Sequence, residues 1–317
     1  MYSAKFCIDD IVPPFNFDLT VKFYNFYPWE YKDHVCTRVE KLSSGNVVKI
    51  YLSSNSDVNK PKLDVLVKSR ERLTPTDKEE VIEKINWCLG LKEDLNEFYN
   101  LAKHDRIMNL AIKDLYGLKT RAFPTVFEAL VEVICAQNVP LARVYQMMKL
   151  LCQELGEPVM FNRNIDYTFP SPDAFLKASP EKLRACKIGY RSKYLWDLAS
   201  EIVLKNFDPE SLKKLSTEEA RKKLLSIKGV GPYTAELVLI IGLRRFDAFH
   251  LDLWTREVLT LFYFQGKKIS DDELREFASQ KWGEHKGRAL LYLLTDAEKL
   301  AQKLNVNFRL KSGAIPP

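Results

Sequence analysis

The chain has 317 residues, of which 46% are hydrophobic, and a formal net charge of +6. This length favours two domains, or one domain with subdomains, over a single small core. The sequence contains no run of about 18 apolar residues, and its N-terminus lacks the basic and apolar regions of a signal peptide, so we expect an intracellular protein without a membrane span. The mild basic excess permits a polyanionic partner without requiring one.

Residues 15 to 75 have the character of β-structure. Phe17, Leu19, Val21 and Phe23 alternate with polar residues, which predicts a half-buried strand. Residues 35–53 are typical of a hairpin connected at 43–46, and residues 63–67 are typical of another short strand. A capping box over Thr76-Asp77-Lys78-Glu79 predicts a helix that ends near Gly90. These features predict an N-terminal domain, residues 1–92, built on a small antiparallel sheet.

The helical period of 3.6 dominates after about residue 91. Residues 126–137 are apolar on nearly all sides, which predicts a central buried helix. Ser216 to Glu219 and Ser270 to Glu273 are two further capping boxes. We therefore predict a mostly α domain over residues 93–311 and a loose tail over 312–317, so that the fold class is mostly α with an N-terminal α/β domain.

No metal-ligand pattern stands out. The four histidines are far apart, and the six cysteines have no zinc-site spacing, which indicates reduced core thiols. The cysteines lie at Cys7, Cys36, Cys88, Cys135, Cys152 and Cys186.

The stretch LLSIKGVGPYTAE, residues 224–236, contains two glycines around one valine and then a proline. A dinucleotide-binding turn does not fit, because a helical segment rather than a strand precedes the glycines and the sixth position is Thr234. The alternative is helix, tight hairpin, helix, with Pro232 at the first helical position. The N–H groups from Gly231 onward would then offer a phosphate site, with Lys228 beside it. Spacing alone leaves this function and an ordinary αα-hairpin equally open.

This stretch resembles the helix-hairpin-helix of the superfamily of base-excision DNA glycosylases, in which an aspartate follows the Gly/Pro-rich hairpin. Asp252, in DAFHLDLWTREVL, lies where that family has its catalytic aspartate. EVICAQNVPLARV resembles the helix and loop that carry the DNA wedge. The N-terminal sheet is similar to the extra domain of the 3-methyladenine glycosylase II and 8-oxoguanine glycosylase branches.

The resemblance implies a catalytic role for Asp252, whose carboxylate would stabilise positive charge on the sugar and steer a water. Capping of the next helix is the alternative, and the two roles are compatible. Tyr233 stands where bifunctional members carry a lysine, which implies a monofunctional enzyme. Tyr233, Trp254 and Tyr292 could line a pocket for an electron-poor base, although each could equally be a core residue.

The wedge resemblance implies that Gln137 and Asn138 fill the hole left by an extruded nucleotide, with a helix cap as the alternative for Asn138. Arg143 matches an arginine that reaches the opposite base in the 8-oxoguanine branch, and a solvated or phosphate-bound arginine is the alternative. Tyr190 and Arg191 match a pair near the orphaned base, unless they are only a surface pair flanking a turn. The further DNA-binding residues that the resemblance implies are Lys228, Gly229, Val230 and Gly231.

We therefore expect a monomeric, monofunctional glycosylase that acts on double-stranded DNA and releases damaged purines, with alkylated bases such as 3-methyladenine favoured. The alternatives are an 8-oxoguanine or hypoxanthine glycosylase, a bifunctional glycosylase/lyase, and a non-catalytic DNA-binding protein that kept the hairpin. The resemblance also implies that main-chain carbonyls of the hairpin could hold K⁺ or Na⁺. We expect no iron–sulfur cluster and no other cofactor, because no cysteine follows residue 186. The carbonyls belong to Leu225, Ile227 and Val230.

Overall fold

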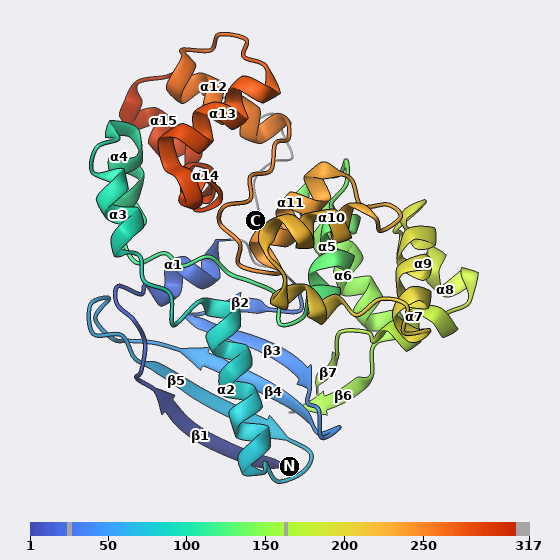
Figure 1. The fold of residues 1–317 in the computed structure, drawn as a ribbon. Coiled ribbons are helices and arrows are strands. Elements are labelled where there is room, and N and C mark those ends of the chain that lie inside the picture. Colours follow the sequence, from blue (N-terminus) through green and yellow to red (C-terminus); the bar gives the residue numbers. More distant parts are fainter. Residues whose placement is uncertain (24–26, 162–163, 309–317) are drawn as a thin grey trace.

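The computed structural model describes residues 1–23, 27–161 and 164–308. Residues 309–317, which include the tail expected at 312–317, lie outside the described residues. A five-stranded antiparallel sheet and a larger set of helices make up the described part (Figure 1), which confirms the predicted fold class.

The sheet has the strand order β1-β5-β4-β3-β2. The helix α2 packs on it (Figure 1) and shares a hydrophobic core with its buried residues. The predicted hairpin is confirmed, since β3 pairs with β4 across a turn in which Gly45 has a φ of +86°. The bounds are β1 Tyr2–Ile8, β2 Glu30–Lys32, β3 Val35–Lys41, β4 Val47–Ser53, β5 Leu63–Ser69 and α2 Pro75–Leu89.

The strand predicted from the alternation at 17–23 is wrong, because Phe17–Lys22 form the helix α1. The Asn16 side chain accepts a hydrogen bond from the N–H of Leu19 at 3.1 Å and so caps this helix. Phe17, Thr20 and Val21 are buried, and this i, i+3, i+4 spacing is helical. The same residues therefore contained both a strand-like alternation and the helical signals, namely an N-cap and an apolar face with helical spacing.

The capping box of α2 begins two residues earlier than predicted. Thr74 accepts a hydrogen bond from the N–H of Asp77, and the carboxylate of Asp77 accepts one from the N–H of Thr74. An aspartate therefore replaces the glutamate that the usual pattern requires at this position, and Pro75 lies in the first turn. The predicted end is confirmed, since Gly90 caps the helix in the left-handed region.

The rest of the described chain is mainly helical, and the predicted buried helix is α5, in which every residue is buried. The capping boxes at Ser216 and Ser270 are both present. The small hairpin β6–β7 and the strand β1 were not predicted. The bounds are α3 Asn96–Ala102, α4 Arg106–Asp114, α5 Val126–Cys135, α6 Leu141–Leu155, β6 Pro158–Phe161, β7 Asn164–Tyr167, α7 Pro172–Lys177, α8 Pro180–Ala185, α9 Arg191–Val203, α10 Thr217–Leu225, α11 Pro232–Ile241, α12 Leu253–Phe264, α13 Asp271–Trp282, α14 Lys286–Thr295 and α15 Ala297–Leu304, with short 3-10 turns at Pro209–Lys214 and Gly283–His285.

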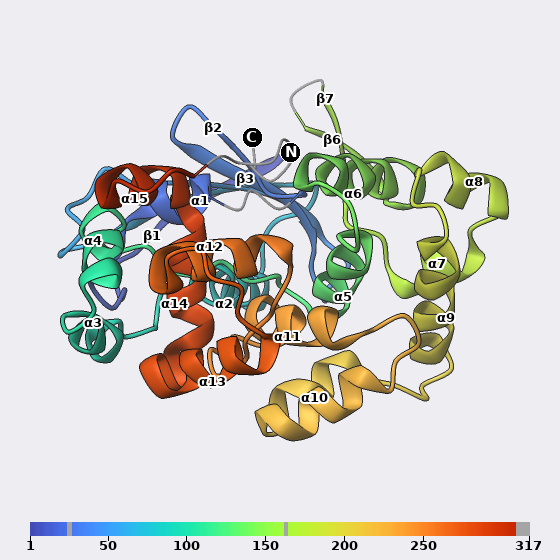
Figure 2. The same ribbon diagram turned by 90° about the horizontal axis from the view of Figure 1, so that it is seen from above.

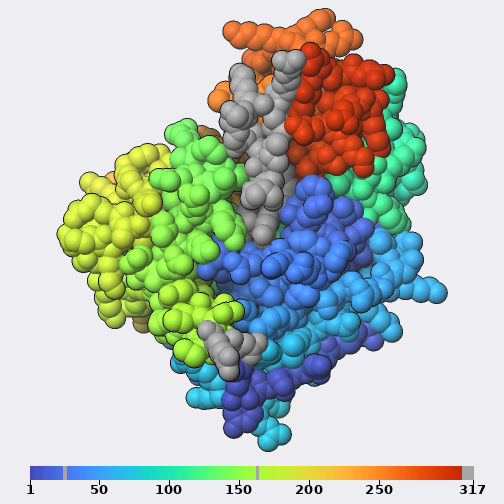
Figure 3. All heavy atoms as spheres, turned by 180° about the vertical axis from the view of Figure 1, so that it is seen from behind, coloured from blue at the N-terminus to red at the C-terminus, as the bar shows by residue number. Residues whose placement is uncertain are grey.

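The helices form two lobes with separate hydrophobic cores. One core is centred on α5, α6, α9 and α11, and the other on α4, α12, α14 and α15. Figure 2 shows the two lobes side by side above the sheet, and Figure 3 shows the sheet region filling the base between them from behind. None of the helices in the described ranges is long and apolar enough to cross a membrane.

All six cysteines are free thiols, and five of them are buried as expected. Cys7, on β1, is the exception to the expected core thiols, since it is exposed. Strand β1 pairs only with β5 in the described sheet, and therefore forms one of its edges.

A buried ion pair joins the sheet to the central helix. Arg38, on β3, donates to both carboxylate oxygens of Glu128, on α5, at 2.8 and 2.7 Å. Its remaining Nε donates to Glu40 at 2.6 Å. Burial opposes the charge of Arg38, but Glu128 and Glu40 hold its pKa well above the usual range. The paired guanidinium therefore stays charged and fixes α5 on the sheet.

Replacing this guanidinium by an apolar group of similar length tests the role of the pair. Arg38→Met leaves the buried carboxylate of Glu128 without its partner, whereas Glu40 keeps its contact with Lys84. We expect the free energy of unfolding to fall by about 3–5 kcal/mol. Chemical denaturation at neutral pH measures the change. The matched control is Arg184→Met, which removes an exposed pair with Glu181 and should cost below about 1 kcal/mol. Equal effects of the two variants would contradict the structural role of Arg38.

Candidate active site

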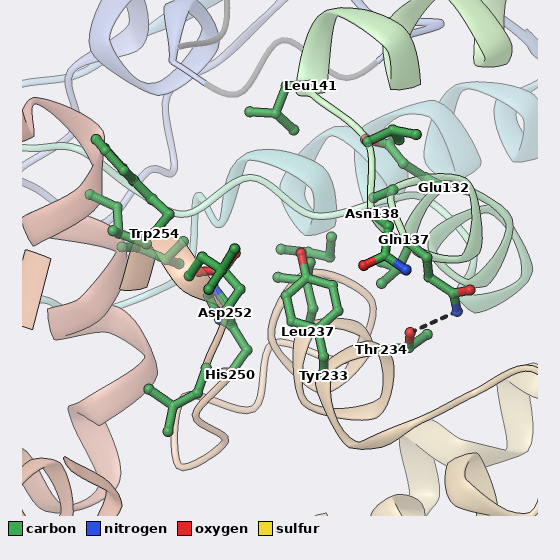
Figure 4. Close-up of a pocket in the computed structure, with 18 of the residues that line it drawn as sticks. Glu132, Gln137, Asn138, Leu141, Tyr233, Thr234, Leu237, His250, Asp252 and Trp254 are labelled. Carbon is green, nitrogen blue, oxygen red and sulfur yellow. Dashed lines mark hydrogen bonds between the residues drawn. The ribbon is translucent and has the colours of Figure 1, made fainter. Parts of the chain in front are cut away.

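A cleft of about 1050 Å³ lies between the two helical lobes. One lobe contributes the end of α5, the loop after it and the start of α11, while the other contributes the start of α12 and part of α14. The remaining wall of the cleft is formed by residues 118–121, by Thr20 on α1 and by Phe23 directly after it. Chain segments that are far apart in sequence therefore meet around one space (Figure 4).

The glycines of the 224–236 stretch have different structural roles. Gly229 has a φ of +87°, and a Cβ there would lie 2.5 Å from the ring of Tyr194. Gly231 has a φ of −95°, and a Cβ there would meet no protein atom within 4 Å. Gly229 thus serves the fold, whereas the open side of Gly231 leaves room for a close approach from outside.

The helix α11 begins at the hairpin without a side-chain cap. Gly231 is its N-cap residue and Pro232 lies in the first turn, as predicted from the sequence. The N–H groups in the first turn of a helix have no intrahelical acceptor, and the helix dipole is positive at this end. The hairpin therefore presents an anion-binding geometry beside the cleft.

Gln137 and Arg191 bind the protein itself. The Gln137 side-chain amide donates to the carbonyl of Gly229 at 2.7 Å and contacts the hydroxyl of Thr234 at 3.1 Å (Figure 4). Arg191 is buried, and its guanidinium donates to the carbonyls of Gln137 and Ile188. These contacts fix the loop after α5 against the hairpin, so that both residues position their neighbours. The interpretation of Arg191 as half of a surface pair is wrong.

Asn138 lies at the cleft with a φ of +54°, a left-handed conformation that asparagine tolerates better than most residues. Tyr190 is 55% exposed at the same cleft, and the Arg191 guanidinium lies 4.6 Å from the centre of its ring. Val230 also lines the cleft. These side chains can reach a ligand that approaches from solvent.

Arg143 and Lys228, like Arg191, do not line the cleft. Arg143 is exposed on the first turn of α6. Lys228 is exposed, and its ammonium forms an ion pair with Asp197 at 2.8 Å. Neither position contributes to the wall of the cleft, so any role of these residues in binding DNA would be on the surrounding surface.

Asp252 is the N-cap of α12. Its Oδ1 accepts a hydrogen bond from the N–H of Thr255 at 2.7 Å. Its Oδ2 accepts none from the described part of the chain, and the residue lines the cleft. Asp252 therefore does cap the helix, and this hydrogen bond fixes its carboxyl group so that the second oxygen is left for a ligand.

Aromatic residues surround Asp252 (Figure 4). Trp254 lines the cleft and also packs on Phe308, with ring centres 5.1 Å apart. Tyr233, in the first turn of α11, packs edge-on against His250 at 5.8 Å. Tyr292 is only 2% exposed, and its hydroxyl donates to the carbonyl of Leu118 at 2.6 Å, so this residue belongs mainly to the core.

Sequence reasoning missed two titratable residues of the cleft, His250 and Glu132. His250 lies two residues before Asp252 and is buried, and its Nδ1 has no hydrogen-bond partner among the described residues. Glu132 interrupts the apolar run of α5, four residues after Glu128. A charged residue within a buried apolar helix was the signal that could have identified Glu132. In the same described ranges, no group of three or more His, Cys, Asp or Glu side chains is arranged to hold a metal ion.

Comparisons with known proteins decide the family. Residues 131–284 match the HhH-GPD superfamily of base excision DNA repair proteins. The chain belongs to this superfamily. The match covers α5, the hairpin and Asp252, which are the segments that meet at the cleft. The assignment to the DNA glycosylases of base excision repair is confirmed, while the base that is released remains open.

Relatives with different names match the chain about equally well. A DNA-3-methyladenine glycosylase of Bacillus subtilis is 29% identical over 68% of this chain and 72% of its own length. A protein of Methanothermobacter thermautotrophicus named "Probable N-glycosylase/DNA lyase" is 26% identical over 68% of this chain and 75% of its own length. The solved structure of a 3-methyladenine DNA-glycosylase from Archaeoglobus fulgidus has a TM-score of 0.79 and 25% identity, and covers 95% of this chain and 100% of its own.

Alanine substitutions separate the roles of the two glycines. Gly229→Ala combines an unfavourable φ with a clash against Tyr194, and we expect it to lower the free energy of unfolding by about 1–3 kcal/mol. Gly231→Ala introduces neither problem and should leave stability within about 1 kcal/mol of the wild type. Denaturant unfolding of both variants measures the difference. Equal destabilisation would show that Gly231 also serves the fold.

His250 should make stability depend on pH. Burial lowers its pKa, against the opposing charges of Asp252 and Glu236, and Arg275 lowers it further. The folded protein thus keeps the imidazole neutral at pH values where the unfolded chain, with an ordinary pKa of about 6.5, takes up a proton. The stability that neutral His250 contributes is therefore complete above the unfolded-state pKa. As pH falls below it, the free energy of unfolding drops by up to about 1.4 kcal/mol per pH unit.

Comparison with His250→Gln isolates this effect. The glutamine does not titrate, so the difference in the free energy of unfolding between wild type and variant should shrink as pH falls from 7.5 to about 5.5. Urea denaturation across this range measures both proteins. Parallel pH curves would show that His250 titrates equally in the folded and unfolded states.

Proposed function

We propose that the chain is a monofunctional DNA glycosylase, which hydrolyses the N-glycosidic bond of a damaged purine flipped out of double-stranded DNA. We further propose that alkylated purines such as 3-methyladenine are its favoured substrates. The observation that carries the proposal is the position of Asp252 in a cleft lined by Tyr233 and Trp254. Tyrosine at position 233 cannot form the Schiff base that a lyase reaction requires.

Asp252 would act on the sugar of the flipped nucleotide. As the bond to the base breaks, positive charge develops at the anomeric carbon, and a fixed carboxylate stabilises that charge. The hydrogen bond from Thr255 holds one oxygen in place, so that the other can face the sugar or orient the attacking water. In a protein that only binds DNA, the carboxylate of Asp252 would not strengthen binding, because it would lie close to the negatively charged phosphates.

The aromatic rings would favour an alkylated base. N-alkylated purines are electron-poor and often cationic, and the faces of tyrosine and tryptophan attract such rings. A base with a positive charge is also a good leaving group, which fits a site with one carboxylate near the sugar and no lysine nucleophile. Oxidised guanine or hypoxanthine is the second candidate, because Arg143 matches an arginine of the 8-oxoguanine branch.

The hairpin would bind the DNA backbone, and the opposite side of the cleft would fill the gap that the flipped nucleotide leaves in the DNA double helix. Phosphate oxygens would accept from the uncapped N–H groups at the start of α11. Asn138 is placed to enter the space that the extruded nucleotide leaves, and Tyr190 is placed to stack near the orphaned base. The protein would act as a monomer, since the resemblance implies no obligate partner.

A monovalent cation in the hairpin stays part of the proposal. The carbonyls of Leu225, Ile227 and Val230 would hold K⁺ or Na⁺, whose charge would help to hold a DNA phosphate. The Ile227 carbonyl already accepts the N–H of Val230 at 3.0 Å, and a carbonyl oxygen has a second lone pair for an ion. The residues present therefore fit such an ion.

The substitution Asp252→Asn tests the mechanism. Asparagine caps a helix about as well as aspartate, so the fold should persist. We expect base release from methylated DNA to fall at least about 100-fold, because the negative charge is lost, while affinity for DNA remains. Turnover near the wild-type rate would rule out the proposed role of Asp252.

Two measurements on the wild type test the rest of the proposal. Chromatography of DNA that has been both methylated and oxidised should detect free 3-methyladenine or 7-methylguanine, and oxidised guanine alone would favour the second candidate. Borohydride should trap no covalent adduct on abasic DNA, because Tyr233 replaces the lysine. A strong adduct would contradict the monofunctional mechanism, and DNA binding without release of any base would leave only a binding protein.

A further inference from the structure

Glu132 is a second carboxyl group in the cleft that contains Asp252 (Figure 4). It lies on α5, one turn after Glu128, and is 5% exposed. The two glutamates differ in their partners, since both oxygens of Glu128 accept hydrogen bonds from Arg38. The Oε2 of Glu132 is buried and has no hydrogen-bond partner among the described residues.

This arrangement is unfavourable for the empty protein. A carboxyl group that loses its water without gaining donors costs free energy. Burial, with the neighbouring charge of Glu128, raises the pKa of Glu132 well above its usual range, although Arg121 opposes this shift.

The surroundings limit what Glu132 could bind. Val133 and Ala136 on α5, with Leu237 and Ile241 on α11, line the same cleft. A ligand that enters there would contact mainly apolar side chains, and few groups could form hydrogen bonds with its polar atoms. An N–H donor or a positive charge on the ligand would supply the partner that Glu132 lacks.

We propose that Glu132 is a specificity-determining residue, which receives the N–H edge of the flipped base and selects purines that carry the positive charge of N-alkylation. This inference rests on the proposed function and adds the group that reads the base. In the empty cleft, burial favours the neutral form of this carboxyl group. A cationic purine favours its ionised form, so the proton leaves to solvent and an ion pair forms in a water-poor site.

The test uses Glu132→Gln, which keeps the shape and hydrogen-bonding capacity of the side chain and removes its ability to carry charge. The matched control is Glu128→Gln on the same helix, where the carboxylate serves the fold. Release of 3-methyladenine and 7-methylguanine from methylated duplex DNA, affinity for duplex DNA with an abasic site, and thermal unfolding are measured for the wild type and both variants. All assays are run below the unfolding range of the least stable protein.

We expect Glu132→Gln to slow release of both methylated bases by about tenfold or more, the value of one charge-assisted hydrogen bond. Its affinity for abasic DNA, which presents no base, should stay within about twofold of the wild type, and its Tm should be unchanged or higher, because a buried group without a partner is made permanently neutral. Glu128→Gln should lower Tm, because Arg38 loses its charged partner on α5.

Unchanged base release by Glu132→Gln would overturn the inference, and so would a fall in Tm as large as that of Glu128→Gln, which would make Glu132 a structural residue. If the wild type releases only a neutral base, the selection for charge is wrong. If it releases no base at all, the proposed function fails and the inference fails with it. The inference is therefore supported only if Glu132→Gln releases methylated bases more slowly while it keeps the wild-type fold and affinity for abasic DNA.

Discussion

The paired charges of Arg38 and Glu128 fix the position of the central helix, and much of the cleft depends on that helix. The sheet provides Arg38, and α5 provides Glu128. The buried helix α5 ends at Cys135, and the loop after it brings Gln137 and Asn138 to the cleft beside the hairpin. A rotation of α5 on the sheet would move both residues at once, and Glu132 with them. Fixing the helix by a bidentate, buried contact limits such motion, because its partners cannot be replaced locally by water.

A second set of contacts holds the lobes in register around the cleft. Arg244, just after α11, donates to the carboxylate of Glu93 and to the carbonyls of Trp87 and Thr120, each at 2.7 Å. Lys119 is buried and donates to three carbonyls near the end of α2 and the start of the chain. Burial lowers the pKa of Lys119 to about 8, but its three acceptors require a full ammonium group, so we regard it as charged at neutral pH. These contacts fix the segment between α4 and α5, which forms one wall of the cleft.

Several polar groups of the cleft are left for a ligand to complete. Glu132 and His250 both have buried side-chain atoms without hydrogen-bond partners among the described residues, and the first turn of α11 has no side-chain cap. Such features lower stability in the free protein, and they are typical of sites that complete their hydrogen bonds with a ligand. The same segments carry the family match, so the unfavourable contacts and the repair function coincide in space. The three capping boxes, by contrast, have both of their hydrogen bonds.

The sequence by itself determined the local elements with strong periodic or capping signals, namely the buried helix at 126–137, the hairpin at 35–53 and the turn at 229–232, because neighbouring residues alone specify these. It also singled out Asp252 and Tyr233, through a motif whose spacing is short. Only the tertiary structure decided that 17–22 is a helix, that Arg191 is buried and Gln137 binds the hairpin, and that Glu132 and His250 line the cleft. Burial and the choice of partner depend on which distant segments pack together, and a pattern of neighbours along the chain does not contain that information.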